Sequence, residues 1–410
     1  MPQLLVLLGL GRVAASAEFA LAQIAAAYPV VLADVSAPAW VRPHLVRHLR
    51  VDPADETALF TAVKALSYAH EVGGVLTYAG EHIVTAARLA CELELPTPTT
   101  EAMAACIDRT ELRAYLARHR VPHPLWAEAR DAEMAAAQAD AVGYPAVIRA
   151  RSGSVAVGQA ANHSEVADVC ARVSRYATPR NPGGMLVERH LDGARIAAET
   201  VVLGSGDTQI VAITRTCLGP PPARQAVRHS VYAHDSVLHN RLIRQAVDRT
   251  VEALGITLGV LHIEMTLAYR GPHITEVTAH LADDLIPLLV KRATGLNLPQ
   301  IAADLAAGQV PKLVPTRQRA AAVHFAYPVV SGRLQRVSVA TPNSHALIDR
   351  SAITQHLGTQ VAAVAQATTE DRLAYWVALG ATTADCHARL DQVSQDLKVD
   401  IAPVAAAHAA

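Results

Sequence analysis

Cysteine is scarce in this sequence. Its 410 residues include only five cysteines, and no two of them form a CxxC spacing. They are Cys91, Cys106, Cys170, Cys217 and Cys386. An odd and scattered set argues against both a disulfide framework and a structural zinc site. A reducing, cytoplasmic environment is therefore expected.

An excess of charge and long apolar runs are also lacking. The formal net charge is −1, so nothing steers the protein toward nucleic acid or an anionic membrane. No apolar run reaches membrane-spanning length. The opening residues MPQLLVLLGLG lack the basic region and cleavage site of a signal peptide, so we interpret them as a buried strand and turn. Aromatic residues make up only 4% of the chain, but hydrophobic residues total 51%, so a large core can be buried, and a length of 410 residues is enough for two or three domains.

The first hundred residues alternate between strand and helix patterns. Apolar runs at residues 4–8 and 30–34 flank a predicted helix at 18–27, which indicates the opening of a doubly wound sheet. The turn after the first strand reads GLGRVA, which does not complete GxGxxG; a tight turn is favoured over a dinucleotide site. A further strand at 74–78 and a helix at 81–93 precede Pro96 and Pro98, where we place a domain boundary near residue 100.

The middle of the chain contains a capped helix and two hairpins. Asp108 is a plausible N-cap for a helix over residues 108–120. Strands at 197–203 and 209–214 flank the turn Gly204–Asp207, and strands at 262–265 and 273–277 flank Arg270-Gly271-Pro272. From about residue 318, short strands and a closing helix at 384–398 predict a third, small domain.

Two carboxylates in the second hairpin carry the strongest chemical signal. Glu264 and Glu276 project from neighbouring predicted strands, and two such carboxylates suit Mg²⁺ bound with nucleotide phosphates. The alternative is a pair of ordinary solvated strand positions. Arg149 precedes a glycine- and serine-containing loop at 151–158 whose backbone N–H groups could close over phosphates, although an ordinary loop is about as consistent with it.

These pieces, in this order, resemble the ATP-grasp superfamily, specifically its L-amino acid ligase and biotin-carboxylase-like carboxylate–amine ligase branch. The resemblance rests on five segments and covers nearly the whole chain: residues 74–124, 143–158 (GYPAVIRARSGSVAVG), 186–202 (LVERHLDGARIAAETVV), 261–295 and 371–382 (DRLAYWVALGAT). It implies an α/β ATP-grasp fold with an N-terminal doubly wound (Rossmann-like) domain and a small C-terminal α+β domain. The implied domains are 1–100, 101–315 with a small lobe at about 120–200, and 316–410.

The resemblance also implies a site and a reaction. ATP's γ-phosphate would pass to a carboxylate, and an amine would attack the acyl phosphate, with ATP and Mg²⁺ as cofactors, small carboxylic or amino acids as substrates, and a homodimer as one allowed assembly. Adenine would contact the hinge, Glu188, Arg189, His190 and Leu191; the phosphates would contact Arg109, Arg149, Ser152, Gly153 and Ser154; and the metal would be held by Glu264, Glu276 and Thr278. His280 would steady the acyl phosphate.

Several implied site positions depart from the family pattern. Arg109 and Arg149 replace lysines, Arg195 replaces the acid that holds the ribose, Thr278 replaces an asparagine and His280 replaces an arginine. Compensation could come from Asp283, Asp284 and His262, although a helix start and a strand-face histidine are the favoured interpretation of those residues. Two hypotheses follow: an active ligase with a retuned nucleotide site, or an inactive ATP-grasp relative acting as a binding or scaffold subunit.

Overall fold

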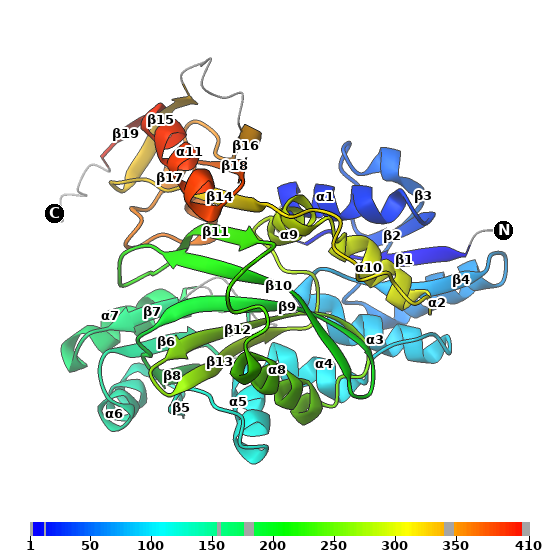
Figure 1. Cartoon of the computed structure of the whole chain (residues 1–410), viewed down its shortest axis with the longest axis horizontal. Coiled ribbons are helices and arrows are strands. Elements are labelled where there is room, and N and C mark those ends of the chain that lie inside the picture. The colour runs from blue at the N-terminus through cyan, green and yellow to red at the C-terminus, as the bar shows by residue number, and fades with distance from the viewer. Residues whose placement is uncertain (1–2, 12–13, 154–156, 176–183, 340–347, 404–410) are drawn as a thin grey trace. The chain divides into compact units, whose positions relative to one another are not determined.

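The computed structural model describes residues 3–11, 14–153, 157–175, 184–339 and 348–403, and the chain divides into two compact units (Figure 1). Unit 1 comprises Met1–His123, Ile196–Thr214 and His234–Arg317. Unit 2 comprises Pro124–Arg195, Arg215–Ala233 and Gln318–Ala410. The three-domain division predicted from the sequence stays a prediction.

Unit 1 opens with the predicted doubly wound arrangement. Its elements are β1 (Leu4–Leu8), α1 (Ala14–Ala25), β2 (Val30–Asp34), β3 (Leu45–Arg50), α2 (Glu56–Ser67), β4 (Val72–Leu76), α3 (Ile83–Glu92), α4 (Thr100–Ile107) and α5 (Arg109–Arg118). The strands form a parallel sheet in the order β3-β2-β1-β4. Because parallel strands are covered on both faces, their sequences are continuous apolar runs, as in Leu4–Leu8.

The rest of unit 1 is built around a second, antiparallel set of strands. Its elements are β9 (Ala194–Gly204), whose first two residues belong to unit 2, β10 (Asp207–Leu218), which continues into unit 2, α8 (Arg241–Leu254), β12 (Gly259–Ala268), β13 (Gly271–Thr278), α9 (Ile286–Thr294) and α10 (Leu298–Ala306). Neighbouring strands follow the order β13-β12-β9-β10. The predicted hairpins and the Asp108 cap are confirmed: the Asp108 side chain accepts hydrogen bonds from the backbone N–H groups of Thr110 and Glu111.

The β12–β13 hairpin separates an apolar face from a polar one. Ile263 and Met265 of β12 and Ile274 and Val277 of β13 lie in the core with residues of α8. Ile274 and Val277 are three residues apart and would face opposite sides of a regular strand. A register shift between Glu264 and Met265 adds a residue to β13 at this point, so both apolar side chains reach the core.

Unit 2 contains three groups of strands. Its first group, in the order β5-β8-β6-β7, comprises β5 (Trp126–Ala129), β6 (Ala146–Ala150), β7 (Val157–Ala160) and β8 (Met185–Arg189), with helices α6 (Ala132–Val142) and α7 (Val166–Ser174). The second, in the order β11-β14-β18-β16, comprises β11 (Ala226–Tyr232), β14 (Ala320–Ala326), β16 (Ile348–Ile353) and β18 (Ala374–Gly380). The third, in the order β17-β15-β19, comprises β15 (Gly332–Val339), β17 (Gln360–Val361) and β19 (Leu397–Ala402).

The closing helix is shorter than the sequence analysis predicts. Helix α11 spans Thr383–Gln395, and Lys398 lies in strand β19. The alternation in Leu397-Lys398-Val399-Asp400-Ile401 has the period of a strand, and Val399 and Ile401 pack against the core around Leu334. The prediction of a helix reaching Lys398 was therefore wrong. Among the residues that the structure describes, no helix is long and apolar enough to cross a membrane.

Candidate functional site

The polar face of the β12–β13 hairpin carries two opposed carboxylates, Glu264 and Glu276, called here the carboxylate pair. These residues are direct partners in the antiparallel register, and His262 faces Thr278 two positions along the ladder. The side chains of Glu264 and Glu276 are 31% and 23% exposed, so the pair is accessible from solvent without being fully hydrated. The sequence-based expectation that the two carboxylates lie side by side on adjacent strands agrees with this geometry.

The bulge in β13 sets the direction of Glu276. The extra residue is Thr275, and its backbone oxygen accepts a hydrogen bond of 2.6 Å from Nη2 of Arg113. Arg113 is fully buried in α5. An arginine that holds a bulge carbonyl fixes the backbone beside Glu276, and bulges are common next to active sites because they re-aim side chains.

Arg109 forms an ion pair with Glu276 of the carboxylate pair. Its Nη2 donates to Oε1 of Glu276 at 2.6 Å, and the Arg109 side chain is only 8% exposed. Arg109 is the first residue of α5, and the Asp108 cap fixes where that helix begins. The predicted phosphate contact and a predicted metal ligand are thus ion-paired in this structure.

Glu199 is a site residue that the sequence analysis missed. It lies on β9 with its side chain 1% exposed, and its Oε1 accepts a 2.6 Å hydrogen bond from the Thr214 hydroxyl. Nδ1 of His262 lies 2.9 Å from the same oxygen, and Nε2 of His262 lies 3.7 Å from Glu264. The imidazole therefore bridges a buried carboxylate and the carboxylate pair.

This bridge determines the charge of His262. Burial by itself lowers the pKa of His262, but attraction and hydrogen bonding from Glu199, with a further contribution from Glu264, hold that pKa well above its usual range. His262 is thus an imidazolium at neutral pH, a cation placed beside Glu264. The favoured sequence interpretation, a strand-face histidine without a site role, does not describe this arrangement.

His280 has a different environment. Its Nδ1 lies 2.8 Å from the backbone oxygen of Leu281 and must donate to it, and burial lowers the pKa of this histidine. His280 is therefore a neutral ring at neutral pH, and it offers no positive charge to an acyl phosphate in this form. Its catalytic role, like the metal role of Thr278, stays a prediction.

The remaining predicted site residues lie in unit 2. Nε of Arg149 on β6 lies 3.6 Å from Oε2 of Glu188 on β8, and both side chains are buried. In the hinge, the N–H groups of Arg189 and His190 donate to the carbonyls of Leu125 and Pro145, so adenine recognition there depends on the other backbone groups of the segment.

The predicted phosphate loop is described only in part. Ser152 and Gly153 are placed, and Gly153 has φ +82°, whereas Ser154 lies outside the described residues. The structure thus gathers Arg109, the carboxylate pair, Thr278 and His280 in unit 1, and the hinge with Arg149 in unit 2. Convergence of these two sets on one nucleotide stays a prediction.

The donor groups of the carboxylate pair are suited to a magnesium ion that is bound together with a nucleotide. Within the described residues, no three His, Cys, Asp or Glu side chains gather as a ready-made metal site. Two opposed, partly exposed carboxylates with a nearby hydroxyl still match Mg²⁺, which is usually held by one or two carboxylates together with substrate phosphates and water. The residues therefore fit a cation that arrives with a nucleotide.

Comparison with known proteins places the chain in a family. The family model for the carbamoyl-phosphate synthase L chain, ATP binding domain, matches residues 108–313. A curated relative, uncharacterized protein y4rH of Sinorhizobium fredii, is 28% identical over 305 residues. That match covers 72% of this chain but only 61% of the relative, so the chain spans less than two thirds of the relative's length.

Solved structures share the fold at low sequence identity. L-amino acid ligase from Bacillus licheniformis superposes with a TM-score of 0.79 at 18% identity, covering 98% of this chain and 99% of the other. Phosphoribosylglycinamide synthetase from Anaerococcus prevotii has a TM-score of 0.70 at 15% identity, with 98% and 100% coverage. Biotin carboxylase from Campylobacter jejuni, solved as a βγ-ATP complex, has a TM-score of 0.66 at 14% identity, with 98% and 93% coverage. The chain therefore belongs to the ATP-grasp ligase family, through the carbamoyl-phosphate synthase L chain ATP-binding domain.

Proposed function

We propose that this protein is an ATP-dependent carboxylate–amine ligase that acts through an acyl phosphate on a small carboxylic or amino acid. The observation that carries the proposal is the carboxylate pair, opposed in register on β12 and β13 with Arg109 beside it. Family membership supports ATP as the phosphate donor. Cytoplasmic location and a homodimer are part of the same proposal.

Glu264 and Glu276 would hold Mg²⁺, with Thr278 offering a hydroxyl two positions along the ladder. Such a cation neutralises charge on the transferred phosphoryl group, which is its chemical contribution. The side chains of the protein do the positioning: they hold the phosphate donor and the acceptor carboxylate in line, and no covalent enzyme intermediate is needed.

Arg109 has two competing anionic partners in this scheme. Before the nucleotide arrives it is paired with Glu276 at 2.6 Å. A phosphate oxygen can take over the guanidinium, because Arg–phosphate and Arg–carboxylate hydrogen bonds are of similar kind and strength. That exchange would release Glu276 for the cation, so we propose that nucleotide and metal binding are coupled through this arginine.

Glu199 and His262 would orient Glu264. Thr214 anchors Glu199, Glu199 holds one ring nitrogen of His262, and the other ring nitrogen faces Glu264. Groups that fix the position of a metal-binding side chain commonly affect metal affinity as strongly as weak ligands do.

The test is a turnover assay on the full chain. The protein is incubated with ATP, Mg²⁺ and a panel of amino and carboxylic acids, and ADP and phosphate release are measured. Glu276→Gln, which keeps the side-chain shape but removes the charge, is the matched control. Acid-dependent ADP release that drops at least 100-fold in Glu276→Gln supports the ligase. If ADP release by the unaltered protein is no greater than that of Glu276→Gln for any acid in the panel, the ligase proposal is rejected for those substrates.

A second candidate, an inactive nucleotide-binding relative, is favoured by one observation. Each member of the carboxylate pair has a protein cation beside it, Arg109 at Glu276 and His262 at Glu264. Those cations could serve in place of the metal and leave a binding site without turnover. A thermal shift with Mg·ATP, together with an absence of ADP release, would select this candidate, since a ligand of the native state raises the melting temperature.

A further inference from the structure

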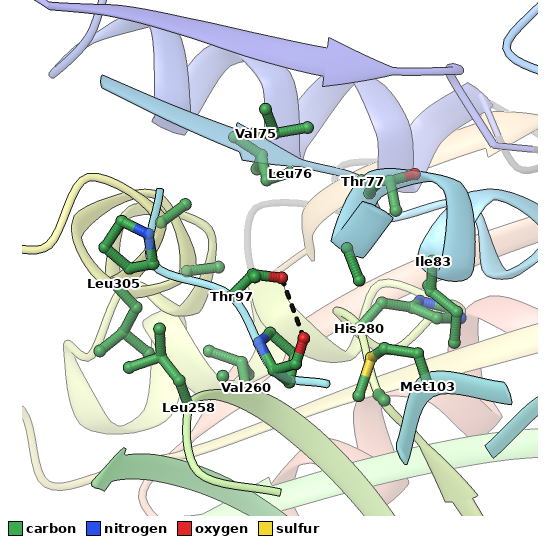
Figure 2. A pocket seen from close by; sticks show the side chains of 18 of the residues that line it. Val75, Leu76, Thr77, Ile83, Thr97, Met103, Leu258, Val260, His280 and Leu305 are labelled. Carbon is green, nitrogen blue, oxygen red and sulfur yellow. Dashed lines mark hydrogen bonds between the residues drawn. The ribbon is translucent and has the colours of Figure 1, made fainter. Parts of the chain in front are cut away.

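Unit 1 contains a cavity of about 100 Å³ lined mainly by apolar side chains (Figure 2). Its walls come from β4, α3, α4, α10, the start of β12 and the segment after β13. Figure 2 shows Ile83, Met103, Val260 and Leu305 directing apolar side chains around one space, with His280 at its edge. We call this space the apolar cavity.

The two threonine hydroxyls that line the apolar cavity are engaged within the protein. The Thr77 hydroxyl donates to the carbonyl of Leu8 at 2.7 Å. The Thr97 hydroxyl donates to the carbonyl of Pro98 at 3.1 Å, the dashed line in Figure 2. A polar or charged guest would therefore lose its water without gaining equivalent partners, which is unfavourable, whereas an alkyl group would not.

His280 lies at the edge of this cavity. Its Nδ1 lies 2.8 Å from the Leu281 carbonyl oxygen, and its Nε2 lies 3.0 Å from the position that a Cβ on Gly80 would occupy. A side chain at residue 80 would therefore press on the ring and change this edge of the cavity.

The strand that holds Glu264 also lines the apolar cavity. Val260 lines it and precedes His262 by two residues on β12, while His280 follows Thr278 by two residues, just after β13. At about 3.3 Å per residue, Val260 and Glu264 are roughly 13 Å apart along the strand. A leucine-sized acid is shorter than this distance, so the acid and a phosphate bound at the pair would span it together.

We infer that the apolar cavity receives the side chain of the acid substrate and selects uncharged, branched aliphatic acids of about leucine size. This inference rests on the proposed function and specifies its substrate class. The volume supports the size limit, because a cavity of about 150 Å³ accommodates benzene, so about 100 Å³ suits a group of roughly four carbons. Glycine would leave the space empty, and glutamate or lysine would bury a charge in it.

The experiment measures binding separately from turnover. Ligand-observed NMR on the full chain, with and without a non-hydrolysable Mg·ATP analogue, compares L-leucine, 4-methylpentanoate, L-phenylalanine, glycine, L-glutamate and L-lysine. Ala302→Leu fills the apolar cavity from α10, and Met103→Ala enlarges it from α4. Ala104→Leu, on the exposed side of α4 beside Met103, is the matched control.

We expect L-leucine to bind at least tenfold more tightly than glycine, L-glutamate or L-lysine. Ala302→Leu should weaken leucine binding at least tenfold, Met103→Ala should move the preference toward L-phenylalanine, and Ala104→Leu should change neither. The same variants are then tested for ADP release with each acid. Met103→Ala enlarges the cavity and Ala302→Leu fills it. If one of the two variants fails to fold, the other still tests the cavity assignment.

The outcomes distinguish this inference from the proposed function. Cavity-dependent leucine binding without ADP release keeps the binding assignment and rejects the ligase. ADP release whose acid preference is unchanged by both cavity variants keeps the ligase and overturns the cavity assignment. No binding of any aliphatic acid, or equal binding of L-leucine and L-glutamate, also overturns it.

Discussion

Arg109 and Glu276 form a 2.6 Å ion pair at the point where α5 begins beside β13. The pair joins a residue expected to contact phosphate with a residue expected to bind metal. In the absence of nucleotide, the Arg109 guanidinium neutralises the negative charge of Glu276 that would otherwise attract a cation. The strength of metal binding should therefore depend on what Arg109 contacts.

Replacing Arg109 tests this competition. In Arg109→Met, Mg²⁺ binding to the nucleotide-free protein should tighten about fivefold to tenfold, because a cation beside Glu276 is removed. Binding of the ATP analogue should weaken in the same variant. Isothermal titration calorimetry measures both, and Arg118→Met at the exposed end of α5 is the control. Equal Mg²⁺ affinity in Arg109→Met and the unaltered protein would show that the pair does not limit metal binding.

Because of His262, the free energy of unfolding should fall as the pH rises above neutrality. Its pKa is raised in the folded state, since burial, which lowers it, is outweighed by Glu199 and Glu264. A raised folded pKa contributes stability that is full below about pH 6.5 and is lost as pH rises through the folded value. His262→Gln should flatten this decline. Urea unfolding at pH 6 to 9 checks it, and an unchanged slope in His262→Gln would contradict the assignment.

His324 should produce the opposite dependence, in unit 2. Burial first and Arg228 second lower the pKa of His324, to about 4, while Asp391 and the Val227 carbonyl oppose the shift. A lowered folded pKa means that stability is full above about pH 6.5 and is lost as pH falls toward 4, by on the order of 2 kcal/mol. The ring is stacked on Trp376 with centroids 6.2 Å apart.

His324→Phe therefore keeps the stacking and removes the titration. Its unfolding free energy should change less between pH 7 and pH 4.5 than that of the unaltered protein. Acid titration followed by circular dichroism measures the difference. If both proteins lose stability equally over that range, another group is responsible.

Position 295 requires a glycine for two reasons, a left-handed backbone conformation and a close contact with Thr316. It ends α9 with φ +85°, and a Cβ there would lie 2.1 Å from Oγ1 of Thr316. Gly255 ends α8 with φ +65° and has nothing within 4 Å of the same position. Gly255→Ala should cost about 1 kcal/mol, the left-handed backbone term alone, whereas Gly295→Ala should cost about 2–4 kcal/mol. Chemical denaturation compares them, and equal costs would exclude the steric contribution.

The fold and the carboxylate pair were predictable from local pattern. Arg270-Gly271-Pro272 marks a turn, and the pattern on each side predicts that Glu264 and Glu276 lie on neighbouring strands. Glu199 was not predictable in the same way, because its importance comes from β9 lying beside β12, a pairing between residues far apart in sequence. A usable signal was present: a lone acid inside the apolar run Ile196–Val202 is a buried position that needs a partner.

The bulge at Thr275 also escaped prediction. Strict alternation from Ile274 would place Glu276 on the same face as the core, and only the pairing with β12 and the hydrogen bond from Arg113 show otherwise. The end of α11 was predicted too late in the chain, because the helix pattern does not mark clearly where the helix stops. Asp396 ends that helix, and the following alternation is visible only when tested for a period of two.

The division of the chain has a practical consequence for anyone who wishes to dissect it. The polypeptide leaves one unit and enters the other after residues 123, 195, 214, 233 and 317. No single truncation can therefore release either unit by itself. A stop codon after residue 123, 195, 214 or 233 removes residues of both units, and one after residue 317 leaves unit 1 joined to the first two segments of unit 2. Isolated expression of the carboxylate-bearing half would need a redesigned gene with new joins between its three segments.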